Sequence, residues 1–388
     1  MQLADRMTPL ASAIFAELTQ RKRELQAAGR PVFDFSVGSP DRAPALHVRR
    51  ALAEAALDPA SYRYAIKDEP ELLAAAAAWY RRRFAVELDP ATEIISLLGS
   101  QDGLAHLALA LINPGDTVLV PDPGYPVFGE GPLLAEARLV RLPLLPENDY
   151  LVDFAAIDPE EARRAKLMIV SYPNNPTTAL APPAFYRDLI AFAKEYDILV
   201  LHDNAYCELT FDGRRTESFL SYPGAKEVGI EFNSLSKTYG LAGARIGFAL
   251  GNRDMIAALA ALKAHVDYGM FIPIQRAACA ALNGPQDEVA ATRAAYERRR
   301  DLLVEGLAAL GWAVPKPPGT MFVWAPIPER FSSSTEFTLE LMEKSGVIVV
   351  PGAAFGPAGD RHVRLALVQP EDTIRDALTS LKASRLFS

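Results

Sequence analysis

The chain has 388 residues, of which 50% are hydrophobic, and it carries a formal net charge of −8. This composition predicts a soluble globular protein with a large core. The balance is acidic and Lys and Arg form no dense cluster, so we expect small-molecule partners and neither nucleic acid nor a membrane surface.

Cysteine and histidine usage argues against a disulfide framework or a metal site. Cys207 and Cys279 form no CxxC pair, and the five histidines are scattered without an HExxH motif. A reducing compartment fits this usage. The first 18 residues hold charges and no long apolar run, so we expect no signal peptide and a cytoplasmic location.

The N-terminal segment predicts a helix followed by an extended stretch. Thr8 before Pro9 is typical of a helix start, and the helical pattern runs to about Ala28. The extended stretch covers residues 32–41.

Between about residues 92 and 250, short β-branched runs alternate with helical patterns. The helical stretches include 104–112 and an amphipathic segment at 183–196. The strand-like runs lie at 92–98, 116–122, 166–172, 197–203, 227–234 and 245–251. Apolar strands of this length, separated by helices, predict an α/β protein whose mostly parallel sheet is covered on both faces.

The pattern changes to α+β after a long helical region that begins near residue 253. Strand-like runs at 321–328, 346–352 and 362–368 are interleaved with helices near 334–345 and 370–384. We therefore predict a large domain formed by residues 46–285. A smaller domain contains residues 286–388 together with the N-terminal arm 1–45.

Several polar residues follow predicted strands, where ligands bind in open α/β sheets. Gly99-Ser100-Gln101 opens a helix and is suited to a phosphate, although many such turns only begin helices. Asp203 ends a very apolar strand, so it needs a partner there or serves as a helix cap. Asn174-Asn175-Pro176 is, taken alone, a turn.

Two basic residues have unusual surroundings. Lys237 stands alone among Ser, Thr and Gly beside an apolar strand, and a partly desolvated lysine is a nucleophile of the kind that holds pyridoxal phosphate. Arg364 lies between apolar neighbours, in either a structural ion pair or a bidentate grip on a carboxylate. The ordinary alternative for Lys237 is a solvated surface lysine. Taken together, these residues match a single cofactor site.

The sequence strongly resembles the class I/II aminotransferases, which are fold-type I pyridoxal-phosphate enzymes. The resemblance covers essentially the whole chain. The motifs that carry it are SPD (39–41), GSQDG (99–103), PDPGYPVF (121–128), YPNNPTT (172–178), HDNAY (202–206), SLSKTYGLAGARIG (234–247) and HVRLAL (362–367). It implies a large domain with a mostly parallel seven-stranded sheet and a smaller α+β domain.

The resemblance also implies a role for each site residue. Lys237 is the covalent and catalytic lysine, Asp203 pairs with the pyridine nitrogen, and Arg364 binds the substrate carboxylate. The other cofactor contacts are Tyr206 and Asn175 at the ring oxygen, Ser100, Gln101, Ser234 and Arg245 at the phosphate, and Tyr125 on the ring face. Asn175 and the backbone of Gly38 assist at the carboxylate.

A further tyrosine implies a homodimer with shared sites. Tyr64, or Tyr62 beside it, resembles the residue that reaches the phosphate of the neighbouring subunit. The stretch after it, KDEPELL, is shorter than the family pattern, and Thr178 and Ala244 replace a glycine and a tryptophan that are frequent in the family. Neither replacement removes a group that the reaction needs.

Within the class, four segments are most similar to LL-diaminopimelate aminotransferases and related alanine or aspartate aminotransferases: 148–154, 202–213, 224–252 and 263–275. We therefore expect ping-pong transfer of an amino group between an L-amino acid and a 2-oxo acid, with LL-diaminopimelate and lysine biosynthesis as the first expectation. Aspartate or alanine transamination is an alternative, and so is a C–S lyase on the same scaffold. A regulator that senses the cofactor fits poorly, because we expect such a chain to carry a basic DNA-binding module, whereas only about forty residues precede SPD and the net charge is acidic.

Overall fold

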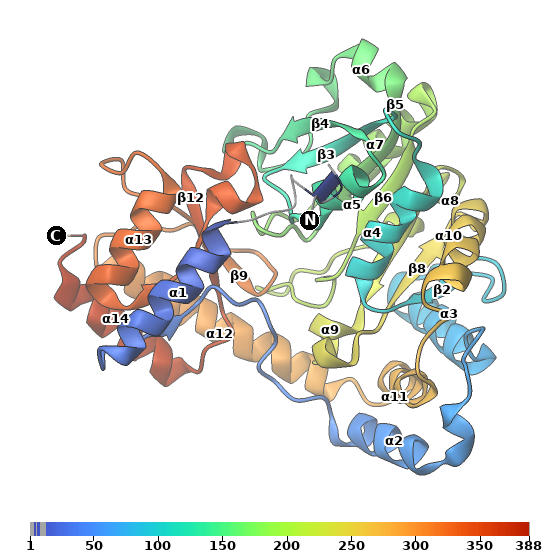
Figure 1. Cartoon of the computed structure of the whole chain (residues 1–388), viewed down its shortest axis with the longest axis horizontal. Helices are drawn as coiled ribbons and strands as arrows, with labels where there is room; N and C mark the ends of the chain where they lie inside the picture. Colours follow the sequence, from blue (N-terminus) through green and yellow to red (C-terminus); the bar gives the residue numbers. More distant parts are fainter. Residues whose placement is uncertain (1–3, 5, 8–12, 388) are drawn as a thin grey trace.

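The computed structural model describes residues 4, 6–7 and 13–387, so the predicted helix start at Thr8-Pro9 lies outside the described residues. A seven-stranded sheet in the order β2-β8-β7-β6-β5-β3-β4 forms the core of the larger part of the molecule, in the right half of Figure 1. Only β8 runs antiparallel to its neighbours, which confirms the mostly parallel sheet. In chain order the strands are β2 (Ile94–Leu97), β3 (Thr117–Asp122), β4 (Arg138–Pro143), β5 (Ala165–Ser171), β6 (Leu199–Asp203), β7 (Gly229–Ser234) and β8 (Gly247–Gly251).

Helices cover both faces of this sheet, as the apolar strands require. One face packs against α4 (Ser100–Leu111), α5 (Val127–Leu134) and α10 (Arg253–Val266). The other face packs mainly against α3 (Pro70–Phe84) and α7 (Pro183–Tyr196), while α11 (Ile272–Asn283) packs on α3 and carries α2 (Leu46–Leu57) on its outer side. The central strands β3, β5, β6 and β7 are buried along almost their whole length.

The helix α7 shows why the sequence folds in this way. Pro183 occupies the first helical position, where its missing N–H costs nothing. Phe185, Leu189 and Phe192 are buried at the spacing of one helical face. The observed range coincides with the prediction from the sequence.

The C-terminal region has its own antiparallel sheet and its own core. This sheet has the order β11-β12-β9 and packs with helices on a separate hydrophobic cluster. In chain order, this region contains α12 (Asp287–Ala309), β9 (Phe322–Pro326), α13 (Ser334–Ser345), β11 (Val350–Pro351), β12 (His362–Ala366) and α14 (Glu371–Ser384). The expected α+β pattern is therefore present. Figure 1 shows the long helix α12 running from this region toward α11.

The N-terminal segment joins the C-terminal region. The short strand β1 (Phe33–Asp34) pairs in parallel with β10 (Val347–Ile348). The helix α1 (Ala13–Ala27) packs through Leu18 and Leu25 against this part of the chain. The pairing supports a small domain that includes the N-terminal arm; the exact division at 45/46 and 285/286 stays a prediction.

Two features differ from the sequence analysis or qualify it. Strand β4 was not predicted, because its alternating arginines and leucines lie on the edge of the sheet, where most side chains are at least partly exposed. Helix α4 begins at Ser100, as predicted from Gly99-Ser100-Gln101, and thus four residues before the apolar run 104–112. Among the described residues, no helix is long and apolar enough to cross a bilayer.

Candidate active site

A cavity of about 290 Å³ lies at the carboxyl ends of the central strands, between the large sheet and the C-terminal region. All the predicted site residues except Tyr64 line it. These residues are Gly38, Ser100, Gln101, Tyr125, Asn175, Asp203, Tyr206, Ser234, Lys237, Arg245 and Arg364. Segments separated by more than 300 residues in the sequence therefore meet in one place, as the strand-end rule predicts.

One end of the cavity is built to receive an anion. Ser100 begins α4, so free backbone N–H groups and the helix dipole face the same space. The guanidinium of Arg245 donates to the carbonyl oxygens of Ala242 at 3.2 Å and Leu98 at 3.4 Å. Gly99 has a φ of +77°, and a Cβ there would lie 2.4 Å from a guanidinium nitrogen of Arg245. Glycine at position 99 thus makes room for this cation.

At the centre of the cavity, Asp203 and Lys237 are both perturbed by burial. Asp203 is the last residue of β6, and its Oδ1 has no hydrogen-bond partner among the described residues. Burial raises the pKa of Asp203 to about 7. Burial and the nearby cations Arg364 and Arg245 lower the pKa of Lys237 to about 8, and its Nζ donates to the carbonyl oxygen of Gly38 at 2.9 Å. Both groups can therefore change protonation close to neutral pH.

At the other end, Arg364 presents a buried cation without a carboxylate partner among the described residues. Its guanidinium donates to Asn175 Oδ1 at 2.9 Å and to the carbonyl oxygen of Ser36 at 3.2 Å. It lies over the rings of Phe322 and Phe355, at 4.1 Å and 4.7 Å from their centroids. Burial lowers the pKa of Arg364 to about 10, so the side chain stays charged at neutral pH. Such a group binds a carboxylate strongly.

Two tyrosines form walls of the cavity. The hydroxyl of Tyr125 donates to Gln101 Oε1 at 3.2 Å, and the ring of Tyr206 meets that of Phe322 at 5.7 Å between centroids. Burial raises the pKa of both tyrosines above the usual value, so both hydroxyls stay protonated at neutral pH. The hydroxyl of Tyr206 can donate a hydrogen bond to a ligand, whereas that of Tyr125 is engaged with Gln101.

The sequence analysis missed five residues that line the cavity. Ser236 adjoins Lys237, and its position there was the only available signal. Phe322 lies in a run that was read only as a strand. The complete set is Leu104, Ala205, Ser236, Ala242 and Phe322.

Tyr64 does not line the cavity of its own chain. Its side chain is 82% exposed and its ring contacts that of Tyr268 at 5.8 Å. Tyr62 is 66% exposed and packs on Phe271. This placement agrees with a contact to another subunit but does not test it, so the assignment of Tyr64 stays a prediction.

The sequence matches the family described as aminotransferase class I and II over residues 30–381. The chain belongs to this family. The aminotransferase is 44% identical over 385 residues to the LL-diaminopimelate aminotransferase of Halothermothrix orenii, with 99% of each chain covered. A solved structure of substrate-bound BacF from Bacillus subtilis is 38% identical, covers 100% of this chain and 99% of that chain, and gives a TM-score of 0.96. A probable N-succinyldiaminopimelate aminotransferase from Thermus thermophilus is 36% identical, with 96% and 100% coverage and a TM-score of 0.91.

These findings confirm the fold-type I architecture and a pyridoxal-phosphate-dependent transaminase. The described residues fit the cofactor on observations of their own. The unpaired Oδ1 of Asp203 is a ready acceptor for a protonated ring nitrogen, and a buried acceptor without a partner is otherwise costly. Arg245 and the start of α4 offer charge and N–H groups for a phosphate. Lys237 supplies an amine of lowered pKa.

Proposed function

We propose that this aminotransferase moves an amino group between LL-diaminopimelate and a 2-oxo acid. The observation that carries this proposal is the relatedness along the full chain. Relatives that are 41–44% identical over 98–99% of this chain bear the name LL-diaminopimelate aminotransferase. The buried cation Arg364 suits the carboxylate that every such substrate carries.

We assign the cofactor contacts as the sequence predicted them. Asp203 pairs with the ring nitrogen, and Asn175 and Tyr206 contact the ring oxygen. Tyr125 lies on the ring face. The phosphate is bound by Ser100, Gln101, Ser234 and Arg245. Pyridoxal phosphate, when bound, supplies a carbonyl that holds the amino group and a ring that withdraws electrons.

Lys237 has two tasks in this proposal. With the cofactor bound, its amine would hold it covalently between turnovers. Once displaced, Nζ would take the proton from the substrate Cα and hand it to the cofactor carbon that carries the amino group. A pKa of about 8 suits both directions of this transfer, because the amine then exists in both protonation states near neutral pH. Arg364, with Asn175 and the backbone of Gly38, orients the carboxylate so that the Cα–H bond faces Lys237.

We propose a homodimer in which Tyr64, rather than Tyr62, reaches the neighbouring phosphate. An exposed apolar patch surrounds Tyr64 and supports a subunit contact. Its members are Tyr62, which packs on Phe271, Tyr64, which packs on Tyr268, and Ile66, which shares a surface hollow with Tyr268. Tyr64 is preferred because Tyr62 already donates to the carbonyl oxygen of Ala56 at 2.8 Å in its own chain. The cytoplasm remains our proposed location, since Cys207 and Cys279 are free.

A screen of amino donors tests the substrate. The purified holoenzyme is assayed with LL-diaminopimelate, N-succinyl-diaminopimelate, aspartate, alanine, glutamate and methionine, each with 2-oxoglutarate and with pyruvate. We expect the highest kcat/KM for LL-diaminopimelate. A higher value for another donor refutes the proposed substrate and leaves the aminotransferase in place. Release of ammonia and pyruvate from cystathionine without a 2-oxo acid would instead indicate the lyase reaction.

A further inference from the structure

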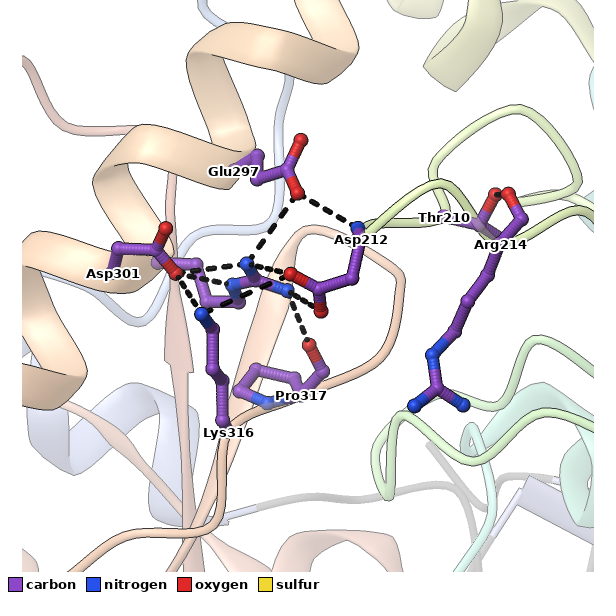
Figure 2. Close-up of polar contacts among 8 residues, drawn as sticks. Thr210, Asp212, Arg214, Glu297, Asp301, Lys316 and Pro317 are labelled. Carbon is purple, nitrogen blue, oxygen red and sulfur yellow. Dashed lines mark hydrogen bonds and ion pairs between the residues drawn. The ribbon is translucent and has the colours of Figure 1, made fainter.

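A buried arginine joins two chain segments that lead to the cavity. Arg300 lies in the middle of α12, and its side chain is fully buried. Its guanidinium donates to both carboxylate oxygens of Asp212, at 2.8 and 2.9 Å, and to the carbonyl oxygen of Pro317 at 3.1 Å. It also contacts Asp301 at 2.8 Å and lies 4.7 Å from the ring centroid of Phe211. Figure 2 shows the side chains of Asp212, Glu297 and Asp301 turned toward one another in this cluster.

The two segments held by Arg300 pair with each other along their backbones. The N–H of Phe211 donates to the carbonyl oxygen of Pro318 at 3.0 Å, and the N–H of Thr320 donates to that of Leu209 at 2.7 Å. The backbone N–H of Asp212 donates to Glu297 Oε1 of α12 at 2.7 Å (Figure 2). Segments 209–212 and 317–320 thus lie side by side. Arg300 binds one residue of each, Asp212 and Pro317, at the same end of the pair.

Each segment continues directly into the cavity. Tyr206 precedes the first segment, and its carbonyl oxygen accepts from the N–H of Leu209 at 2.9 Å. Phe322 follows the second segment by two residues. The rings of Tyr206 and Phe322 meet at 5.7 Å, and the guanidinium of Arg364 lies 4.1 Å from the centroid of Phe322. Phe322 also pairs with Ala366 in the ladder of β9 and β12, so the two segments and this ladder together hold Phe322 against Arg364.

The charges and the hydrogen-bond geometry of the cluster explain why position 300 needs an arginine. Three carboxylates, those of Asp212, Glu297 and Asp301, surround Arg300, and Lys316 is the second cation, at 2.9 Å from Asp301. The hydrogen bonds from Arg300 hold the pKa of Asp212 below its usual value. Lysine lacks the planar fork that binds Asp212 with two parallel bonds and reaches Pro317 at the same time.

We propose that Arg300 is a positioning residue for substrate binding, which acts through Asp212 and Pro317 to set the support of Phe322 under Arg364. The proposal rests on the role assigned above to Arg364. Arg300 touches neither the cavity nor any residue assigned to the cofactor phosphate. Its loss therefore weakens the grip on the substrate carboxylate more than it weakens cofactor binding.

The test compares Arg300→Lys and Asp212→Asn with a matched control, Arg298→Gln. Arg298 lies on the same helix, is 63% exposed and pairs with Glu371. In the holoenzyme we expect KM for the amino donor to rise about tenfold in both variants, whereas kcat and the cofactor dissociation constant stay within about twofold. The control keeps the wild-type KM.

A double variant shows whether the two residues act through one contact. The KM of Arg300→Lys/Asp212→Asn is expected to rise no further than in the single variants. If Arg300→Lys fails to fold, the KM of Asp212→Asn alone tests the proposal. The Asp212 side chain is 45% exposed, so replacing its carboxylate should disturb the fold less. An unchanged KM in folded variants overturns the proposal. A kcat that falls while KM stays constant does so as well, and so does a double-variant KM equal to the product of the single effects.

Failure of this inference is separable from failure of the proposed function. Arg364→Lys is measured in the same series with the same donor. If it raises KM while the Arg300 and Asp212 variants do not, the positioning role alone is wrong. If Arg364→Lys leaves KM unchanged, the carboxylate assignment itself is wrong.

Discussion

The two sides of the cavity are built by different means. On the side of the large sheet, Asp203 ends a strand, while Ser100 and Lys237 lie in the first turn of helices that follow strands, so the parallel topology places them together. On the C-terminal side, Arg364 lies inside an antiparallel strand and is held by the rings of Phe322 and Phe355. The cofactor side depends on backbone architecture, and the substrate side depends on side-chain packing.

The largest expected effect tests the sheet side. Lys237→Ala should lower kcat by at least roughly 10³-fold, because the reaction loses both its covalent anchor and its proton carrier. Steady-state assays of the purified variant measure this, and circular dichroism shows whether the fold is kept. Wild-type turnover in a folded variant would show that the sheet side has been assigned wrongly.

A substitution on the C-terminal side of the cavity should change mainly KM, in contrast to the effect of Lys237→Ala on kcat. Arg364→Lys keeps the charge but loses the fork, so we expect kcat/KM to fall about 10²-fold, mainly through a higher KM. Initial rates over a range of donor concentrations separate the two constants. A fall in kcat at constant KM would show that Arg364 does not act mainly in substrate binding, and the proposed difference between the two sides of the cavity would be wrong.

The burial of Asp203 on the sheet side should also affect the pH dependence of the unfolding free energy, which is measured without any assay of activity. Burial raises the pKa of Asp203 from 3.8 to about 7, so in the cofactor-free protein the folded state binds a proton that the unfolded state releases. This contribution is fully present below about pH 4 and is lost as the pH rises toward 7. Relative to Asp203→Asn, the wild type should therefore lose roughly 3 kcal/mol of unfolding free energy between pH 4 and 7.

Urea unfolding of both cofactor-free proteins at several pH values measures that difference. The Asn variant is the control, since its other ionisable groups are the same. Parallel pH profiles for the two proteins would contradict the raised pKa.

The smallest effect concerns the anion-binding end. In Gly99→Ala the new Cβ meets Arg245, and we expect the cofactor dissociation constant to rise about tenfold, as for the loss of one charge-assisted hydrogen bond. Gly115→Ala is the matched control, because Gly115 also has a positive φ, +86°, but its Cβ would have no neighbour within 4 Å. Equal losses in both variants would point to backbone strain and away from displacement of Arg245.

The same contrast explains how much the sequence predicted. Asp203 and Lys237 were found because an isolated charge after an apolar strand is visible in the sequence. The packing of Phe322 on Arg364 was not, since it joins residues about 40 positions apart and phenylalanine is common in any core. Arg300 belongs to the run RRR at 298–300, which cannot be told from a solvated helix face until the helix is placed.

The central claim is that the amine of Lys237 carries the cofactor. The holoenzyme is reduced with borohydride, digested, and its peptides are weighed by mass spectrometry, with Lys237→Ala treated in parallel. We predict that the peptide around position 237 gains the mass of a phosphopyridoxyl group on Lys237, and that the variant gains none. A wild-type peptide of unchanged mass, or the added group on a different lysine, would contradict the account.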